Sequence, residues 1–502
     1  MQFTTISFGI FFAIVFVLYW TAFRKSQRAQ NALLLAASYL FYGCWDWRFL
    51  GLIIFTTLST YATALYARGK YGKGLTTLNI VINLAILAGF KYLGFFVDNF
   101  ILLLSSLGAD IGTAGIEILL PVGISFYTFQ CIAYSVDVRK GRIDACGNLL
   151  DFATFVAYFP QLVAGPIERA SRLLSQISRR EGWNREFAVS GLRMVLFGVM
   201  KKVCIADMLA IYVDYFFTYV GSPTGTVMTG VLFVLQIYFD FSAYSEIARG
   251  ASRMLGIELM ANFRFPYFSR NIIEFWQRWH ISLMWWFRDY VYIPLGGSRR
   301  GKLRTVFNLT AVFLLSGLWH GAAWNFVAWG AYWAIAYIIG KYLLRLKRHD
   351  EPISLGQLPQ MALTMAVVTL GIYIFRCTTW EEIGIGLART GYFALFFGAC
   401  WAVAKAVSLI YSRSPIAAKG AVLICCAVLI AALCRDPAVA PNYWWVIPML
   451  FAFAIEWKNR NNDYPVQYIG KSRRTRWAIY WLCMLFILLS EDAGMSFIYF
   501  QF

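Results

Sequence analysis

Residues 271–326 read NIIEFWQRWHISLMWWFRDYVYIPLGGSRRGKLRTVFNLTAVFLLSGLWHGAAWNF and contain His280 and His320, two of the three histidines in the chain. Each of them follows a tryptophan, and a Gly-Gly turn with four basic residues separates them. The apolar run that ends at His320 is long enough to enter a membrane. A histidine there is costly unless it has a partner or a function, and its side chain exchanges protons near neutral pH. The stretch therefore predicts a membrane protein and marks a candidate catalytic site.

The composition also indicates a membrane protein. Of the 502 residues, 60% are hydrophobic and 14% are charged, whereas soluble domains contain about 25% charged residues. The apolar runs predict an all-α polytopic membrane protein with roughly 11–13 transmembrane helices, in a single domain over residues 1–502. These runs are residues 5–23, 31–45, 49–67, 75–97, 117–137, 190–218, 223–247, 304–322, 324–344, 359–376, 388–411, 418–434, 441–457 and 476–490.

The net charge of +19 indicates membrane topology rather than nucleic-acid binding. Lysine and arginine concentrate in cytoplasmic loops, and no nucleic-acid motif is present. The loop charges predict that residues 458–476 lie inside and that both ends of the chain lie outside. The ten cysteines are scattered without the spacing of a zinc site, so no metal site is expected. We expect membrane lipids, and no nucleic acid, around the spans.

Two regions differ from ordinary spans. Residues 140–190 include FPQLVAGP, which is too short to span and is interrupted by proline and glycine. Residues 268–290 mix charged with aromatic residues, which is typical of an interfacial or re-entrant helix. Broken segments are tolerated at membrane depth only when they are buried or line a cavity. On one continuous helix, Trp276, His280 and Met284 would share a face.

Two acidic residues interrupt the apolar run IYFDFSAYSEIARG, and acids in such a setting need partners. One interpretation is that Asp240 and Glu246 form ion pairs with Arg249 or Arg253. The other is that the two acids line the wall of a cavity. Basic residues near the histidines are also open to two interpretations. Arg278 and Arg288 can bind the phosphates of a cytoplasmic donor, or they reflect membrane topology alone.

Several long motifs resemble one protein family. They are FWQRWHISLMWWFRDYVYIPLGG, SGLWHGAAWNFVAWG, PVGISFYTFQ (121–130), YSVDVRKG (134–141), FPQLVAGPIER (159–169), FGVMKKVCIAD (197–207), YFDFSAYSEIARGASRMLGI (238–257) and FIYFQF (497–502). Over essentially its whole length the chain resembles the membrane-bound O-acyltransferases (MBOAT family). Within the family it is most similar to the branch that acetylates alginate, peptidoglycan and other bacterial polysaccharides. The resemblance implies a ring of tilted helices, with re-entrant and interfacial helices, around a central tunnel.

The resemblance implies a site as well. His320 lies in the WHG motif. From the residues alone it is either a general acid or base or a residue that only caps a helix. The resemblance to the family implies that it is the catalytic residue. His280 is expected to line the same passage. Trp319 and Asn325 are expected to line the pocket of the donor. Candidate donors of hydrogen bonds to the reaction oxyanion are Trp319, Trp324, Asn325 and His280.

The family transfers acetyl groups from cytoplasmic acetyl-CoA, which is a substrate and not a permanently bound cofactor. The acetyl group is delivered outside, usually to a partner of the SGNH hydrolase type, which then acetylates the polysaccharide. The resemblance thus implies a multi-pass protein of the bacterial inner (cytoplasmic) membrane. Alternatives that the sequence leaves open are a lipid or protein acyltransferase of the same family, and a non-catalytic acyl transporter or scaffold.

The last residues, FIYFQF, resemble the C-terminal motif of a small partner protein in the D-alanyl-teichoic-acid system. The tyrosine of that motif is proposed to accept the acyl group. Here the motif is part of the transferase itself, which makes Tyr499 a candidate catalytic residue that accepts the acyl group as a phenol ester. The alternative is that the segment is an interfacial aromatic anchor.

Overall fold

The computed structural model describes residues 1–108, 119–163, 165–180, 182–219, 221–349, 351–433, 444–462 and 472–490, together with residues 495, 497 and 498. Within these residues every regular element is a helix. The prediction of an all-α fold is therefore confirmed.

The helices follow the predicted apolar runs closely. The first half of the chain forms α1 (Ile6–Trp20), α2 (Gln27–Asp46), α3 (Leu50–Leu65), α4 (Gly72–Lys91), α5 (Leu93–Ser106), α6 (Ile124–Arg139), α7 (Leu149–Ala157), α8 (Phe159–Leu162), α9 (Leu173–Ser178), α10 (Arg185–Lys201), α11 (Asp207–Thr218) and α12 (Pro223–Met254). The second half forms α13 (Ile272–Arg278), α14 (Ile281–Phe287), α15 (Gly301–His320), α16 (Trp324–Ile338), α17 (Leu358–Arg376), α18 (Trp380–Ala388), α19 (Thr390–Arg413), α20 (Pro415–Leu433), α21 (Val446–Asn459) and α22 (Arg473–Leu489). Short turns of 3₁₀ or π helix are η1 (Trp47–Phe49), η2 (Lys202–Ala206), η3 (Pro266–Phe268), η4 (Arg288–Tyr292), η5 (Ile339–Leu343) and η6 (Leu355–Gln357).

Several helical segments are suited to cross a membrane. In the described part of the chain, five are long and apolar enough to span: Gln27–Leu65, Gly72–Lys91, Pro223–Met254, Leu355–Arg376 and Thr390–Arg413. Shorter apolar helices are Ile6–Trp20, Leu93–Ser106, Leu149–Leu162 and Pro415–Cys425. These segments make the chain a multi-pass membrane protein. A total of roughly 11–13 spans stays a prediction, because short or broken spans are not identified by length and hydropathy alone.

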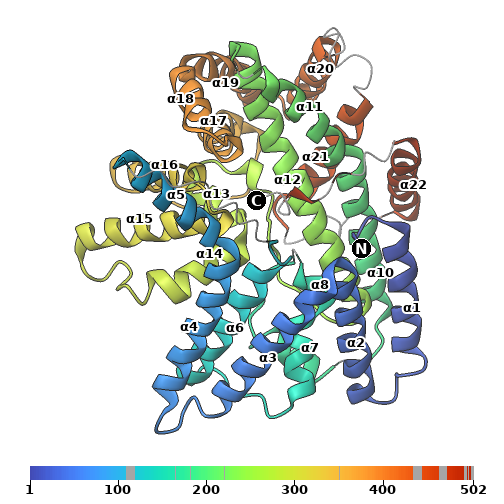
Figure 1. Cartoon of the computed structure of the whole chain (residues 1–502). Helices are drawn as coiled ribbons and strands as arrows, with labels where there is room; N and C mark the ends of the chain where they lie inside the picture. The colour runs from blue at the N-terminus through green and yellow to red at the C-terminus, as the bar shows by residue number, and fades with distance from the viewer. Residues whose placement is uncertain are drawn as a thin grey trace.

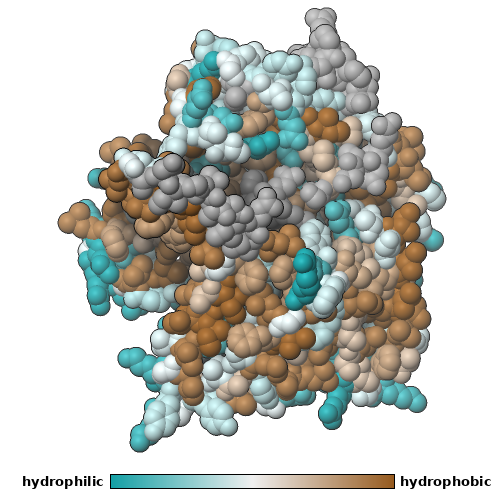
Figure 2. Space-filling model, viewed as in Figure 1, coloured by the Kyte–Doolittle hydropathy of each residue, from teal (hydrophilic) through white to brown (hydrophobic). Residues whose placement is uncertain are grey.

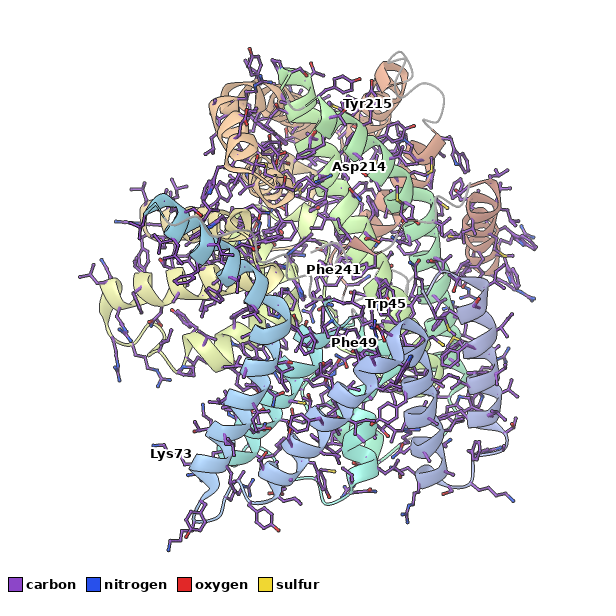
Figure 3. The ribbon with its side chains drawn as sticks, viewed as in Figure 1. Trp45, Phe49, Lys73, Asp214, Tyr215 and Phe241 are labelled. Atoms are coloured by element: carbon purple, nitrogen blue, oxygen red, sulfur yellow. The ribbon has the colours of Figure 1, made fainter. Side chains whose placement is uncertain are left out.

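The surface agrees with a lipid environment. The face drawn in Figure 2 is hydrophobic over much of its area, and polar side chains gather toward its edges. Contiguous apolar surface of this kind marks a membrane or protein contact. Lys73 lies near one end of α4, far from the centre of the molecule (Figure 3).

The central element of the fold is α12. It begins at Pro223, and the hydroxyl of Ser222 caps it by accepting the Gly225 amide at 2.9 Å. The helix is buried along most of its length and packs against α10, α11 and α17. In Figure 1 it runs through the middle of the molecule, with α17 to α19 near one end and α2, α3 and α7 near the other. The buried charged residues of this helix, which include Asp240 and Glu246, form ion pairs within the protein, as charges in such a core must.

The stretch 268–290 is not one helix. It forms α13 and α14, which are separated at His280, where φ is +42°. The backbone bonds of the break go to an earlier loop: Ile281 N–H donates to the Asn262 carbonyl at 2.9 Å, and Arg264 N–H donates to the Arg278 carbonyl at 3.0 Å. These bonds satisfy the backbone that a continuous helix would have paired within itself. The prediction of a shared helix face for Trp276, His280 and Met284 is therefore wrong.

The described residues of FPQLVAGP, which are 159–163, 165 and 166, are buried within the protein, and Val163 also lines a cavity. Burial and a cavity wall were the two settings in which the sequence allowed this broken segment. Phe159–Leu162 forms the single turn α8, and all four of its residues are buried. The Phe159 amide donates to the Ser38 hydroxyl at 3.0 Å, and the Gln161 side chain donates to the Pro166 carbonyl at 3.0 Å. Hydrogen bonds with side chains thus satisfy backbone groups that a single helical turn is too short to pair within itself.

Candidate active site

His320 is the last residue of α15, and glycines fix where this helix ends. A Cβ atom on Gly317 would lie 2.1 Å from the Phe326 carbonyl oxygen, and one on Gly321 would lie 2.0 Å from the Phe326 ring. Only glycine permits so close an approach of α15 to the start of α16. The close packing of α15 against α16 therefore fixes the position of the His320 imidazole beside the start of α16.

Aromatic rings enclose His320. The rings of Trp319, Trp329 and Phe375 lie edge-on to the imidazole, with centroids 5.0, 5.1 and 5.1 Å away. The residue is 7% exposed. Edge-to-face packing at these distances holds an imidazole in one orientation. Such an orientation is needed for proton transfer to a bound reactant.

His280 also contacts Trp319. Its ring centroid is 5.8 Å from that of Trp319 and 4.8 Å from that of Phe241, and the residue is 1% exposed. The two histidines are 40 positions apart in the sequence and contact the same indole. The structure thus brings the two histidines together around Trp319. His280 is not among the residues that line the two cavities described below, so its place in the same passage stays a prediction.

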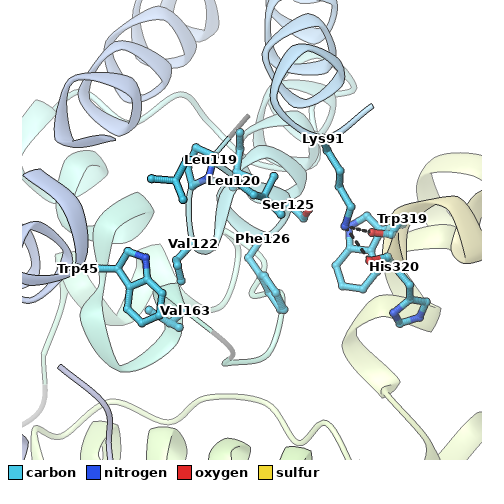
Figure 4. Close-up of a pocket in the computed structure, with 13 residues that line it drawn as sticks. Trp45, Lys91, Leu119, Leu120, Val122, Ser125, Phe126, Val163, Trp319 and His320 are labelled. Atoms are coloured by element: carbon cyan, nitrogen blue, oxygen red, sulfur yellow. Dashed lines mark hydrogen bonds between the residues drawn. The ribbon is translucent and has the colours of Figure 1, made fainter. Parts of the chain in front are cut away.

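Lys91 adds a charge to this group. Its ammonium group, at the end of α4, donates to the carbonyls of Trp319 at 2.6 Å and of His320 at 2.9 Å (Figure 4). These carbonyls belong to the last turn of α15, where backbone acceptors lack helical partners and the helix dipole favours a cation. Lys91 is not among the residues predicted for the site, because it lies inside the apolar run 75–97, which predicts an ordinary span. A lysine inside such a run is a signal in itself.

Two cavities adjoin the segment that follows Trp319. The first has a volume of about 290 Å³ and is lined by residues from α2, α4, the start of α6 and α15, among them Trp45, Lys91, Ser125, Phe126, Trp319 and His320. The second has a volume of about 360 Å³ and is lined by Gly321, Asn325, Phe326, Phe375, Arg376 and Thr378, among others. His320 lines the first cavity and its neighbour Gly321 lines the second, so the two cavities meet the chain at consecutive residues.

Asn325 lies at the second cavity and not at the first. Its amide nitrogen donates to the Phe375 carbonyl at 3.2 Å, and its buried Oδ1 has no partner among the described residues. Trp324 points elsewhere: its indole N–H donates to Asn99 at 2.9 Å, and the side chain is about half exposed. The hypothesis that Trp324 donates to a reaction oxyanion is therefore wrong for this arrangement.

The two arginines that were candidates for phosphate binding each hold a carboxylate. Arg278 pairs with Glu274 at 2.8 Å, and Arg288 pairs with Asp289 at 2.7 Å. Neither residue lines one of the two cavities. Arg169 also pairs with Asp289, at 2.6 Å. Burial raises the pKa of Asp289, but the hydrogen bond from Arg288 and the charge of Arg169 outweigh it and hold that pKa below its usual value.

The acids of α12 pair with lysines. Asp240 lies 2.7 Å from the ammonium group of Lys202, and Glu246 lies 3.1 Å from that of Lys201. The suggested partners Arg249 and Arg253 instead pair with Glu258, at 3.0 and 2.5 Å. The expected arginine pairing is therefore wrong. Arg249 and Arg253 are near the two acids in the sequence, whereas Lys201 and Lys202 lie at the junction of α10 and η2, about 40 residues earlier in the chain.

Tyr499 lies outside the described residues. The residues just before it, Phe497 and Ile498, are described and are buried against α12. The Phe497 ring stacks on Tyr244, with centroids 4.3 Å apart, and lies 5.8 Å from the ring of Phe241. Phe241 is the residue that packs on His280.

Comparison with known proteins identifies this arrangement. The profile of the MBOAT, membrane-bound O-acyltransferase family matches residues 146–378, a region that contains both buried histidines. The chain is 41% identical over 366 residues to a probable alginate O-acetylase AlgI of Pseudomonas syringae pv. tomato, covering 72% of this chain and 70% of that protein. The corresponding protein of Pseudomonas putida is 39% identical over 402 residues, covering 79% and 80% of the two chains.

A further relative is named for a different polysaccharide. A peptidoglycan O-acetyltransferase of Helicobacter pylori is 34% identical over 393 residues, covering 72% of this chain and 73% of its own. Identities of this size over most of both chains, joined to two buried histidines at one aromatic site, establish common descent. The chain belongs to the membrane-bound O-acyltransferase family and is an acyltransferase.

Proposed function

We propose that this acyltransferase transfers acetyl groups from cytoplasmic acetyl-CoA to a hydroxyl group, and that the acetyl group finally reaches an extracytoplasmic polysaccharide. The observation that carries the proposal is that His320 lines one cavity, directly precedes Gly321 of a second cavity, and contacts Trp319, the indole that His280 also contacts. The relatives named for alginate and peptidoglycan acetylation support the acetyl group and the polysaccharide. The proposed location is the bacterial inner membrane, where cytoplasmic acetyl-CoA is available.

His320 is the proposed general base. Its imidazole accepts the proton of the attacking hydroxyl, whose oxygen bonds to the thioester carbonyl carbon. The carbon–sulfur bond then breaks, and the imidazolium returns the proton to the leaving thiolate, so that coenzyme A leaves as a thiol. Trp319, His280 and Asn325 are the proposed donors to the oxyanion that forms between these steps.

Tyr499 is the proposed first acceptor. It directly follows Ile498, which is buried beside α12, and the neighbouring Phe497 packs near Phe241, the ring that contacts His280. A phenol can carry an acyl group as an ester. The ester is then passed to an extracytoplasmic partner of the SGNH type, which acetylates the polysaccharide.

Arg278 and Arg288 are proposed to bind the phosphates of the donor. The Arg288 side chain is 54% exposed, so a phosphate can reach it without displacing core residues. Guanidinium groups bind phosphate oxygens in a bidentate manner. Arg169, which shares Asp289 with Arg288, adds a second cation to the same place.

Release of the coenzyme A thiol by purified protein tests the catalytic step. His320→Ala should lower this rate by about 10²–10⁴-fold, the contribution of a general base. His349→Ala is the matched control, because the third histidine is exposed and only its backbone carbonyl accepts a hydrogen bond, from Arg270. Equal rates for the two variants would refute the role of His320.

Two further measurements separate the remaining parts of the proposal. Intact mass after incubation with acetyl-CoA should reveal one added acetyl group in the wild type and none in Tyr499→Phe. A fully active Tyr499→Phe variant would remove the tyrosine from the pathway. A series of donors from acetyl-CoA to palmitoyl-CoA tests the acyl group, and a preference for the long chain would indicate a lipid or protein acyltransferase instead.

A further inference from the structure

The end of the chain is attached to the central helix by a charged residue. The Ile498 amide donates to Oδ2 of Asp240 at 2.7 Å, in a contact between residues 258 positions apart. Phe497 and Ile498 are each 1% exposed. A hydrogen bond to an ionised acceptor is stronger than one between neutral groups. This part of the C-terminal segment is thus held in the core by a specific bond as well as by packing.

Asp240 is itself held in place. Its Oδ1 lies 2.7 Å from the ammonium group of Lys202, which also lies 2.6 Å from Asp207. The three side chains are between 3% and 5% exposed. Buried ion pairs are weak evidence for stability, because desolvation offsets most of their attraction. Because Asp240 in this buried network also binds the Ile498 amide, the network points to a role in positioning the C-terminal segment rather than in stability.

The same turn of α12 reaches the catalytic group. Phe241, the residue after Asp240, lies edge-on to His280 with centroids 4.8 Å apart. Figure 3 draws Phe241 near the middle of the molecule. Phe497 packs on Tyr244, one turn further along. Asp240, Phe241 and Tyr244 thus connect the C-terminal segment with the histidine site through a single helical turn.

We infer that Asp240, held by Lys202, is a positioning residue that docks Phe497 and Ile498 on α12, near the Phe241 ring that contacts His280, and so supports the transfer step in which Tyr499 is the proposed acceptor. The inference rests on the proposed role of Tyr499 as acyl acceptor. Asp240 does not touch the reacting atoms. It acts through the Ile498 amide, one peptide unit before the tyrosine.

The chain contains a matched control for this inference. Glu246 lies on the same helix and pairs with Lys201, which also binds Glu456 at 2.9 Å. This network is buried as deeply as that of Asp240 and Lys202, but its contacts are with Lys201 and not with Phe497 or Ile498. Substitution of either acid should therefore destabilise the protein similarly, because each leaves a buried lysine with one carboxylate fewer.

Hydrogen exchange at the Ile498 amide measures the docking directly. Asp240→Ala should accelerate this exchange by roughly 10- to 100-fold, the loss expected for a hydrogen bond to a charged acceptor. Glu246→Gln should leave the exchange unchanged. Asp240→Asn keeps one acceptor oxygen without the charge and should give an intermediate acceleration, which also covers the case in which the alanine variant does not fold.

Turnover with acetyl-CoA gives the second readout. Asp240→Ala and Asp240→Asn should lower kcat and leave the KM for acetyl-CoA unchanged, because the donor is bound elsewhere, whereas Glu246→Gln should retain kcat. If Asp240→Ala and Glu246→Gln change kcat and exchange equally, Asp240 has only a structural role and the inference fails. It also fails if the Ile498 amide stays protected in both Asp240 variants.

The two roles can fail separately. If Tyr499→Phe is fully active while Asp240→Ala releases the Ile498 amide, the docking stands and the proposed acyl acceptor is wrong. If Tyr499→Phe is inactive while Asp240→Ala leaves the Ile498 amide protected, the acceptor stands and the docking residue is wrong.

Discussion

Replacement of Lys91 by methionine tests how the end of α15 holds the catalytic imidazole. Methionine keeps the length of the side chain and removes its charge and its donors. The carbonyls of Trp319 and His320 then lose the ammonium group that lies 2.6 and 2.9 Å from them. The last turn of α15 also loses the cation that opposes its dipole. We expect the position of His320 to loosen, since its own carbonyl is one of the two acceptors.

The magnitude follows from the hydrogen bonds. A hydrogen bond to a charged group contributes about 1.5–3 kcal/mol. The variant loses two such bonds but no longer buries an ammonium group, and burial of a charge is unfavourable. We take the net loss of free energy to equal about one such hydrogen bond and assume that all of it raises the activation barrier by displacing His320. The rate of acyl transfer then falls roughly 10- to 100-fold, since about 1.4 kcal/mol corresponds to a factor of ten.

The assay is release of the coenzyme A thiol, with kcat and the KM for acetyl-CoA measured separately. Lys91→Arg keeps a cation and should recover part of the rate. Lys73→Met is the control, because Lys73 is an exposed lysine at the opposite end of the same helix (Figure 3). A Lys91→Met variant with wild-type kcat and unchanged thermal stability would refute this account of how His320 is positioned.

The other predictions concern packing, the second histidine and pH. Gly317→Ala should destabilise the protein by about 1–3 kcal/mol, because its Cβ would lie 2.1 Å from a backbone oxygen. Gly51→Ala, with open space around it, should not lower the melting temperature, and equal melting temperatures would contradict the close approach. His280→Ala should lower kcat less than His320→Ala does, and the reverse order in thiol-release assays would exchange their roles. Asp289 has a lowered pKa, so its contribution to stability is present above about pH 3.9 and is lost as pH falls further. Asp289→Asn should therefore lower the melting temperature at pH 7 more than at pH 3.5, and an equal loss at both pH values would refute this linkage.

The sequence predicted local structure well, because its main signal is local. Apolar runs of sufficient length become helices wherever the lipid leaves the backbone no other partners. The run 304–322 became Gly301–His320, and the run 223–247 became the start of Pro223–Met254. The motifs supplied the roles of the histidines, which the runs alone could not assign.

The errors came from contacts between distant parts of the chain. The break at His280 depends on bonds to Asn262 and Arg264, which no helical periodicity reveals. Asp240 pairs with Lys202, and that lysine lies in η2, which precedes α11, rather than in the same helix. Lys91 reaches carbonyls more than 200 residues away. Pairings of this kind follow from the packing of helices, which a single sequence does not specify.

The rings around His320 have an electrical consequence. A membrane protein with cavities on both sides of one residue could conduct ions and dissipate the gradients that the cell maintains. Here Trp319 lines the first cavity and Phe375 lines the second, and both pack edge-on against the imidazole together with Trp329, at 5.0 to 5.1 Å. Hydrophobic constrictions resist wetting and block hydrated ions. We therefore expect the aromatic enclosure that orients the histidine also to resist the passage of ions from one cavity to the other.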